Sequence, residues 1–141
     1  MGGIEFPSWP DDETLVWRTA WPIGIKNQLV SSTNMDGQIT NSDLELAATI
    51  LHEATIAAHK PMAKLTMYTG CDNVLTVVWR NKGSTTTDKV TAQLLRLASL
   101  QQRRLRHIPQ LLYLPGHLNQ FADILSRRLD LNDSQLIDLL H

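Results

Sequence analysis

Apolar residues recur at helical spacing in two long segments of the chain. Between residues 42 and 59 they fall three or four positions apart, as along one face of an α-helix, and Pro61 follows. A second segment with this spacing starts at Thr87 or Asp88 and runs to about Arg106. The pattern therefore predicts two long amphipathic helices.

Shorter segments have the composition of β-strands. Residues 2–6, 14–21 and 65–69 are rich in β-formers and are bounded by glycine, proline or acidic loops. Residues 111–114 read Leu-Leu-Tyr-Leu, a continuous apolar run that is typical of a strand buried on both faces. We therefore predict four strands.

Short helices are expected between and after these strands. One or two helical turns fit residues 23–30, and residues 73–80 predict a helix with Val74, Val77 and Val78 facing inward. Two further helices are expected at residues 119–127 and 132–140. Strands and helices alternate along much of the chain, which predicts an α/β fold with a helix-covered sheet.

Length, charge and cysteine content limit the class of protein. A chain of 141 residues fits one domain over residues 1–141, and its net charge of −1 excludes a globally basic nucleic-acid binder. Cys71 is the single cysteine, which excludes an intrachain disulfide and a cysteine-rich zinc site and favours an intracellular setting. The first residues lack the pattern of a signal peptide, and no apolar run reaches membrane-spanning length, so no membrane is expected.

Three acidic residues occupy positions that suit a metal site. Glu45 and Asp123 lie in the first turns of predicted helices, and Asp72 follows a predicted strand, where open α/β sheets place their sites. Carboxylates suit magnesium, and two such ions can promote phosphodiester hydrolysis. Simpler interpretations also fit: Glu45 completes a capping box with Ser42, Asp72 caps the next helix, and Asp123 matches the helix dipole.

Cationic residues gather along and after the second long helix and beside the shorter ones. A local stripe of this kind can bind phosphates, although arginines at helix ends also stay solvated and favour the helix dipole. Asn41, Ser42 and Asn73 stand beside the acidic residues in the sequence and could donate hydrogen bonds to a sugar-phosphate backbone. The candidate substrate-binding residues are Asn41, Ser42, Asn73, Lys82, Arg103 and Arg104.

Several motifs resemble the ribonuclease H domains of retrotransposon reverse transcriptases. Residues 41–48, NSDLELAA, resemble the family's helix-opening motif, and residues 65–73, LTMYTGCDN, resemble its fourth strand and the acid that follows. Residues 114–127, LPGHLNQFADILSR, are similar to the closing motif of these domains, and residues 2–6, GGIEF, are similar to the second strand. The resemblance spans nearly the whole chain, with its motifs in the family's order.

The resemblance implies a mixed sheet flanked by helices and hydrolysis of the RNA strand of an RNA–DNA hybrid. It implies Mg²⁺ as the cofactor, with Mn²⁺ as a substitute, and Glu45, Asp72 and Asp123 as its ligands. His117 matches a loop histidine that assists proton transfer or product release, although a solvent-exposed loop histidine fits the sequence equally. The implied partners are an RNA–DNA hybrid or another nucleic acid and the reverse transcriptase domains of the same polyprotein.

One part of the family pattern is missing. The family's first strand, which is central in its sheet and carries its first catalytic aspartate, has no counterpart before Gly2. We therefore expect an incomplete sheet and weak or no cleavage by this chain. The alternatives are a non-catalytic module that binds nucleic acid or positions a reverse transcriptase, and a decayed fragment with no activity.

Overall fold

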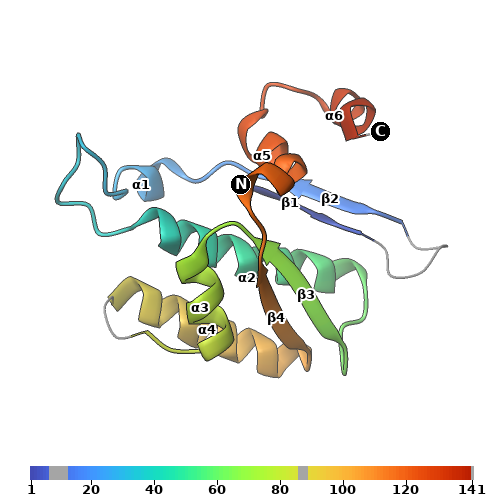
Figure 1. Cartoon of the computed structure of the whole chain (residues 1–141), viewed down its shortest axis with the longest axis horizontal. Helices are drawn as coiled ribbons and strands as arrows, with labels where there is room; N and C mark the ends of the chain where they lie inside the picture. The colour runs from blue at the N-terminus through green and yellow to red at the C-terminus, as the bar shows by residue number, and fades with distance from the viewer. Residues whose placement is uncertain (7–12, 86–88, 141) are drawn as a thin grey trace.

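The computed structural model describes residues 1–6, 13–85 and 89–140 and shows a mixed α/β protein, about half of it helical (Figure 1). The expected order of strands and helices is found. The elements are β1 (Gly2–Glu5), β2 (Leu15–Arg18), α1 (Ile23–Lys26), α2 (Asn41–His59), β3 (Thr66–Cys71), α3 (Val74–Lys82), α4 (Lys89–Leu105), β4 (Ile108–Tyr113), the 3₁₀ turn η1 (Gly116–Leu118), α5 (Gln120–Arg127) and α6 (Asp133–Leu140).

Helix α2 is the element around which the others are arranged. Its residues Leu46 and Ile50 form the buried core together with Leu95 and Ala98 of α4. Helix α4 runs in the same direction as α2, because Thr91 near its start bonds Asp43 while Gln101 near its end bonds the Ile50 carbonyl. The apolar periodicity correctly predicted both helices, and Ala98 of α4 lies on the expected face. In α2 the spacing indicated a face with Leu44, Ala48 and Leu51, whereas Leu46 and Ile50 meet α4 and Leu51 is 40% exposed.

The strands form two separate pairs rather than one sheet. β1 pairs antiparallel with β2, with Gly3 opposite Trp17, and β3 pairs parallel with β4, with Tyr68 opposite Gln110. The parallel connection passes through α3 and α4, as parallel pairing requires a long crossover. The two pairs lie along α2 without hydrogen bonds between β1 and β3 (Figure 1).

The start of α2 differs from the capping box that the sequence predicted. Thr40, not Ser42, is the N-cap: its hydroxyl accepts from the Asp43 amide at 3.2 Å, and the Asp43 carboxylate accepts from the Thr40 amide at 2.9 Å. Asp43 is buried and also accepts from the Thr91 hydroxyl. The Asp43 carboxylate therefore accepts from three donors and completes the cap, and Glu45 takes no part in it.

Replacing Thr40 by alanine is expected to lower the free energy of unfolding by about 1 kcal/mol, because the Asp43 amide loses its acceptor and Asp43 loses one of its donors. Urea unfolding followed by circular dichroism measures this change. Asn41→Ala is the matched control at the adjacent exposed position and is expected to shift stability by less than about 0.5 kcal/mol. Equal losses from both variants would contradict the assigned cap.

Two further expectations about burial were wrong. In β4, Leu111 is buried but Leu112 is 53% exposed, because β4 packs against helices on one face only. In α3, Val74 and Val78 lie outside and the buried residues are Thr76 and Arg80. The Ser42 carbonyl and the Glu53 carboxylate, both of α2, accept hydrogen bonds from Thr76 and Arg80, so the polar face of α3 turns inward. The expected helix start at Thr87 or Asp88 lies outside the described residues.

Within the described part of the chain, no helix combines the length and apolar character needed to cross a bilayer.

Candidate metal centre

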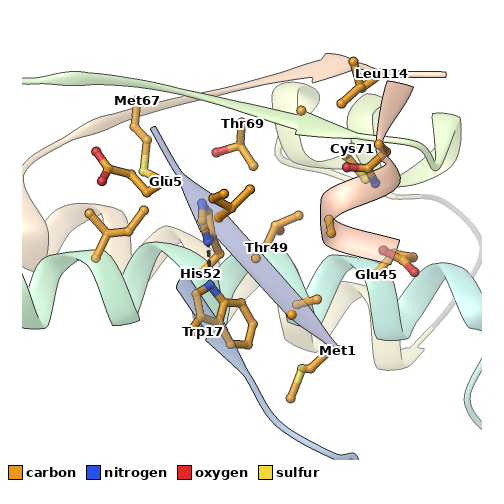
Figure 2. Close-up of a pocket in the computed structure, with 18 of the residues that line it drawn as sticks. Met1, Glu5, Trp17, Glu45, Thr49, His52, Met67, Thr69, Cys71 and Leu114 are labelled. Carbon is orange, nitrogen blue, oxygen red and sulfur yellow. Dashed lines mark hydrogen bonds between the residues drawn. The ribbon is translucent and has the colours of Figure 1, made fainter. Parts of the chain in front are cut away.

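A cavity of about 1030 Å³ lies between the two strand pairs, along the side of α2. Figure 2 shows its walls, with Met67, Thr69 and Cys71 of β3 on one side and Thr49 and His52 of α2 on the other. β1 and α5 close the remaining sides. Segments distant in the sequence thus share one concave surface, the usual setting of a ligand site.

Three metal-ligating side chains meet at one end of this cavity. A carboxylate oxygen of Glu45, the Cys71 sulfur and a carboxylate oxygen of Asp72 all lie within 4.8 Å of one another. Glu45 comes from the second turn of α2, and Cys71 and Asp72 come from the end of β3 and the residue after it. The sequence predicted Glu45 and Asp72 at one site, and the structure brings these two carboxylates together.

Helix capping does not account for either carboxylate. Thr40 and Asp43 make the cap of α2, and Asn73 caps α3 by accepting from the Thr76 amide at 3.0 Å. The expectation that Asp72 caps α3 was therefore wrong by one residue. Since neither Glu45 nor Asp72 is used as a cap, both carboxylates remain available to a ligand in the cavity.

The electrostatics of the cluster favour a cation. Burial raises the pKa of Glu45, and the neighbouring charge of Asp72 raises this pKa further. The Met1 amino group acts in the opposite direction, toward the ionised carboxylate. Two carboxylates at this separation repel each other, and a divalent ion between them would offset the repulsion. Binding such an ion would lower the pKa of Glu45.

The donor set suits an oxygen-preferring ion at two of its three positions. Glu45 and Asp72 offer the hard ligands that Mg²⁺ and Mn²⁺ prefer. Burial raises the pKa of the Cys71 thiol to about 11, so the thiol is protonated near neutral pH and bonds the Asn73 carbonyl instead. The residues present therefore fit a magnesium ion held by two carboxylates and water, without the sulfur.

Asp123 and His117 lie near this end of the cavity but outside the cluster. Asp123 lines the cavity from α5, yet its carboxylate bonds the Arg127 guanidinium at 2.6 Å. His117 is exposed on η1, and a Cβ at the adjacent Gly116 would lie 3.8 Å from an Asp72 oxygen. Asp123 would have to leave Arg127 to join the other two acids.

The candidate substrate-binding residues separate into two groups. Asn41 lines the cavity, and Ser42 and Asn73 lie beside the acids, where the Asn73 amide donates to the Ser42 hydroxyl at 3.1 Å. This bond ties α3 to α2 and so positions Asp72 beside Glu45. Both side chains therefore have a structural partner in addition to their place near the site.

The cationic candidates lie toward the other end of α2. Lys82 ends α3, and Arg103 and Arg104 stand in the last turn of α4. This turn lies near the far end of α2, because the Arg106 carbonyl, just after α4, accepts from the Lys64 amide, which follows α2 in the chain. The length of α2 from Glu45 to its end is about 20 Å. A single nucleic acid would need to extend along the molecule to contact both groups.

Two buried polar clusters were missed by sequence reasoning. Glu53, fully buried in α2, accepts two hydrogen bonds from Arg80, at 3.0 and 2.8 Å, and one contact from His107 at 3.0 Å. His52 accepts from the Trp17 indole at 2.8 Å (Figure 2). The spacing of apolar residues does not mark Glu53 or Arg80 as buried. The one available signal was the pair of adjacent polar residues, His52 and Glu53, among the apolar residues of the segment 42–59.

Compared with known proteins, the chain matches no protein-family model, no curated protein and no solved structure.

Proposed function

We propose that this protein is a ribonuclease H-like domain that binds an RNA–DNA hybrid and hydrolyses its RNA strand weakly with magnesium. The observation that carries the proposal is the meeting of Glu45 and Asp72 at one end of the cavity, with neither carboxylate used as a cap. These are two of the three acids that the sequence resemblance implies as ligands. The unjoined edges of β1 and β3 also agree with the implied sheet that lacks a central strand.

Glu45 and Asp72 would hold the ion, with Asp123 as the third ligand after release from Arg127. When bound, a divalent ion activates water and stabilises the leaving oxygen of a phosphodiester. Asn41, at the cavity wall, can donate to the backbone of the nucleic acid. A further aspartate that the resemblance implies is not supplied by residues 1–141, so we expect slow turnover.

Hybrid cleavage tests this function directly. With magnesium, the chain is expected to release RNA fragments from an RNA–DNA hybrid slowly, and Asp72→Asn is expected to reduce this release at least tenfold. Magnesium is also expected to raise the melting temperature of the chain but not that of Asp72→Asn, since an ion that binds only the folded state stabilises it. Asp36→Asn is the matched control, because Asp36 is an exposed acid in the turn before α2.

The outcomes separate the alternatives. Cleavage that persists in Asp72→Asn at the rate of Asp36→Asn would contradict the proposed site. Rapid cleavage by the unmodified chain that is lost in Asp72→Asn would support the proposed site. It would contradict the expectation that an incomplete site turns over slowly. A magnesium effect on melting that is equal in the two variants would place the ion elsewhere.

A non-catalytic nucleic-acid-binding module is the second candidate, favoured by the ion pair between Asp123 and Arg127. In that case the chain binds the hybrid in calcium, which supports binding without cleavage, and releases no fragments in magnesium. The binding should weaken with salt if Lys82, Arg103 and Arg104 contact phosphates.

A further inference from the structure

Two basic residues share an uncommon backbone conformation. Lys64 has a φ angle of 65° and Arg106 one of 55°, and no other residue except glycine has a positive φ in the described part of the chain. This left-handed region brings the Cβ atom of an L-residue too close to the backbone, so glycine or asparagine is usual there. A lysine and an arginine at these positions are therefore less favourable for the fold than glycine.

The two residues lie side by side where the chain enters β3 and β4. The Lys64 amide donates to the Arg106 carbonyl at 2.7 Å, and the Ile108 amide donates to the Leu65 carbonyl at 2.9 Å. β3 and β4 start at the same end of the molecule, with Thr66 opposite Ile108 (Figure 1). The two left-handed residues thus place a lysine and an arginine together at one end of the parallel pair.

The fold makes no use of these two side chains. Lys64 and Arg106 are exposed, and neither side chain has an ion pair or a hydrogen bond among the described residues. Arg103 and Arg104, in the last turn of α4, are exposed and unpaired in the same way. These four residues form the basic cluster. Strained backbone that is retained without a structural role for the side chain points to a function of that side chain.

The segments that form the basic cluster carry no negative charge. Residues 54–71 and 89–122 contain no aspartate or glutamate. Glu5 lies near the end of α2, but its carboxylate is bonded to Lys60 at 2.8 Å. In a chain with a net charge of −1, this end of the molecule is a local positive region, which attracts a ligand with several negative charges.

The phosphates of a nucleic acid suit the basic cluster. Three of its four members are arginines, and a guanidinium group can donate two parallel hydrogen bonds to one phosphate. Contacts of this kind follow the backbone and do not read the base sequence. The choice of nucleic acid as the ligand rests on the proposed function, whereas the cluster itself does not.

The basic cluster is well separated from the metal centre. β3 starts two residues after Lys64 and ends at Cys71, which lies next to Glu45. Its six residues span roughly 20 Å. One strand of a duplex advances about 3.4 Å per nucleotide, so this separation corresponds to about six base pairs. Phosphates bound at the cluster are therefore distant from any phosphodiester at the metal centre.

We propose that Lys64, Arg103, Arg104 and Arg106 form a second nucleic-acid site, which binds backbone phosphates roughly 20 Å from the metal centre. Binding at this site needs no metal ion. An RNA–DNA hybrid would thus be held on the protein before an ion binds and after the RNA strand is cleaved.

Binding of a fluorescent 18-base-pair RNA–DNA hybrid to the 141-residue chain in EDTA tests the proposal by fluorescence anisotropy. The double variant Lys64→Gly with Arg106→Gly is expected to bind about tenfold more weakly, since each lost phosphate contact costs roughly threefold in affinity. The slope of log affinity against log salt concentration should fall by about two. Lys64→Arg with Arg106→Lys keeps both charges and should keep the slope.

Melting of the same variants separates a binding role from a structural one. Glycine adopts the left-handed region without strain, so the double glycine variant is expected to melt about 3 °C higher than the unmodified chain. Circular dichroism measures this shift and shows that the variant folds. A gain in stability together with a loss of binding is expected only if the two basic residues are retained for the ligand.

Lys26→Gln is the matched control, because it removes a positive charge from the other end of the molecule. Lys26 is exposed in α1. Burial lowers the pKa of the Met1 amino group, and the nearby charge of Lys26 lowers it further, which places Lys26 on the side of the metal centre. In EDTA the acids of that centre repel phosphates, so this variant is expected to bind the hybrid with less than about a twofold loss.

Four results would overturn the proposal. One is absence of saturable binding in EDTA, or binding by the double glycine variant with unchanged affinity and salt slope. Another is an equal loss in Lys26→Gln, which indicates a general effect of charge. The third is a lower melting temperature of the double glycine variant, which assigns both residues to the fold. The fourth is displacement of the hybrid by poly-glutamate as effectively as by unlabelled hybrid, which indicates a site for acidic polypeptides.

The nuclease proposal and the second site can fail separately. Cleavage that depends on Asp72, with hybrid binding unchanged in the double glycine variant, would keep the nuclease and remove the second site. Binding that depends on Lys64 and Arg106, without any cleavage in magnesium, would keep the second site and contradict the nuclease.

Discussion

Replacing Arg80 by methionine is expected to lower the free energy of unfolding by about 3–5 kcal/mol, the usual cost of removing one partner from a buried ion pair. Arg80 and Glu53 have side chains that are only 4% and 1% exposed, and Arg80 donates to both Glu53 oxygens. Without Arg80, Glu53 keeps only the neighbouring His107 and Gln101 groups. A buried carboxylate with so little compensation favours the unfolded state, where water solvates it.

Urea unfolding at neutral pH measures this loss. Arg104→Met is the matched control, an exposed arginine at the end of α4, and is expected to change stability by less than about 0.5 kcal/mol. The double variant Glu53→Leu with Arg80→Met is expected to be more stable than Arg80→Met alone, because apolar side chains of similar size often replace a buried pair without loss. A double variant less stable than Arg80→Met would contradict this account of the pair.

Lowering the pH from 6.5 to 4 is expected to reduce the free energy of unfolding by about 3 kcal/mol through His52 alone. Burial lowers the pKa of His52 from 6.5 to about 4, despite the opposing effect of Glu5. The unfolded chain therefore takes up this proton at a higher pH than the folded protein. Stability from His52 is complete above pH 6.5 and is lost as the pH falls toward 4. Protonation also removes the acceptor of the Trp17 indole.

The contribution of His52 is isolated by comparing variants across the pH range, because other acids titrate there as well. His52→Gln is expected to lose less stability than the wild-type chain between pH 6.5 and 4. His59→Gln is the control, since His59 is exposed near the end of the same helix, and it should follow the wild-type profile. Identical pH profiles for His52→Gln and the wild-type chain would contradict the lowered pKa.

The elements that the sequence predicted best are those with long apolar periods. Residues 42–59 and the described part of the helix that ends near Arg106 are helical as their spacing indicated, because many small contacts add along a long helix. The face that packs was predicted for part of α4 only, since α2 meets α4 through Leu46 and Ile50. The order of strands followed from short β-rich segments between turn residues.

Short elements were predicted less well, since a few polar contacts outweigh their apolar pattern. The nine residues of α3 turn Thr76 and Arg80 inward because the Ser42 carbonyl and Glu53 lie there to receive them. Such partners come from distant parts of the chain and leave no periodic signal. The same holds for the site, where sequence order suggested Glu45 and Asp72 but could not show Arg127 bonded to Asp123.

The hydrogen bonds at the start of α2 have a consequence for the proposed metal site. Asp43 joins Thr40 to Thr91 of α4, and Ser42 joins Asn73 of α3. These bonds fix the backbones that carry Glu45 and Asp72 without involving either carboxylate. At the proposed site the two backbones are therefore held in place in the absence of an ion, and only the side chains of Glu45 and Asp72 would have to adjust when one binds.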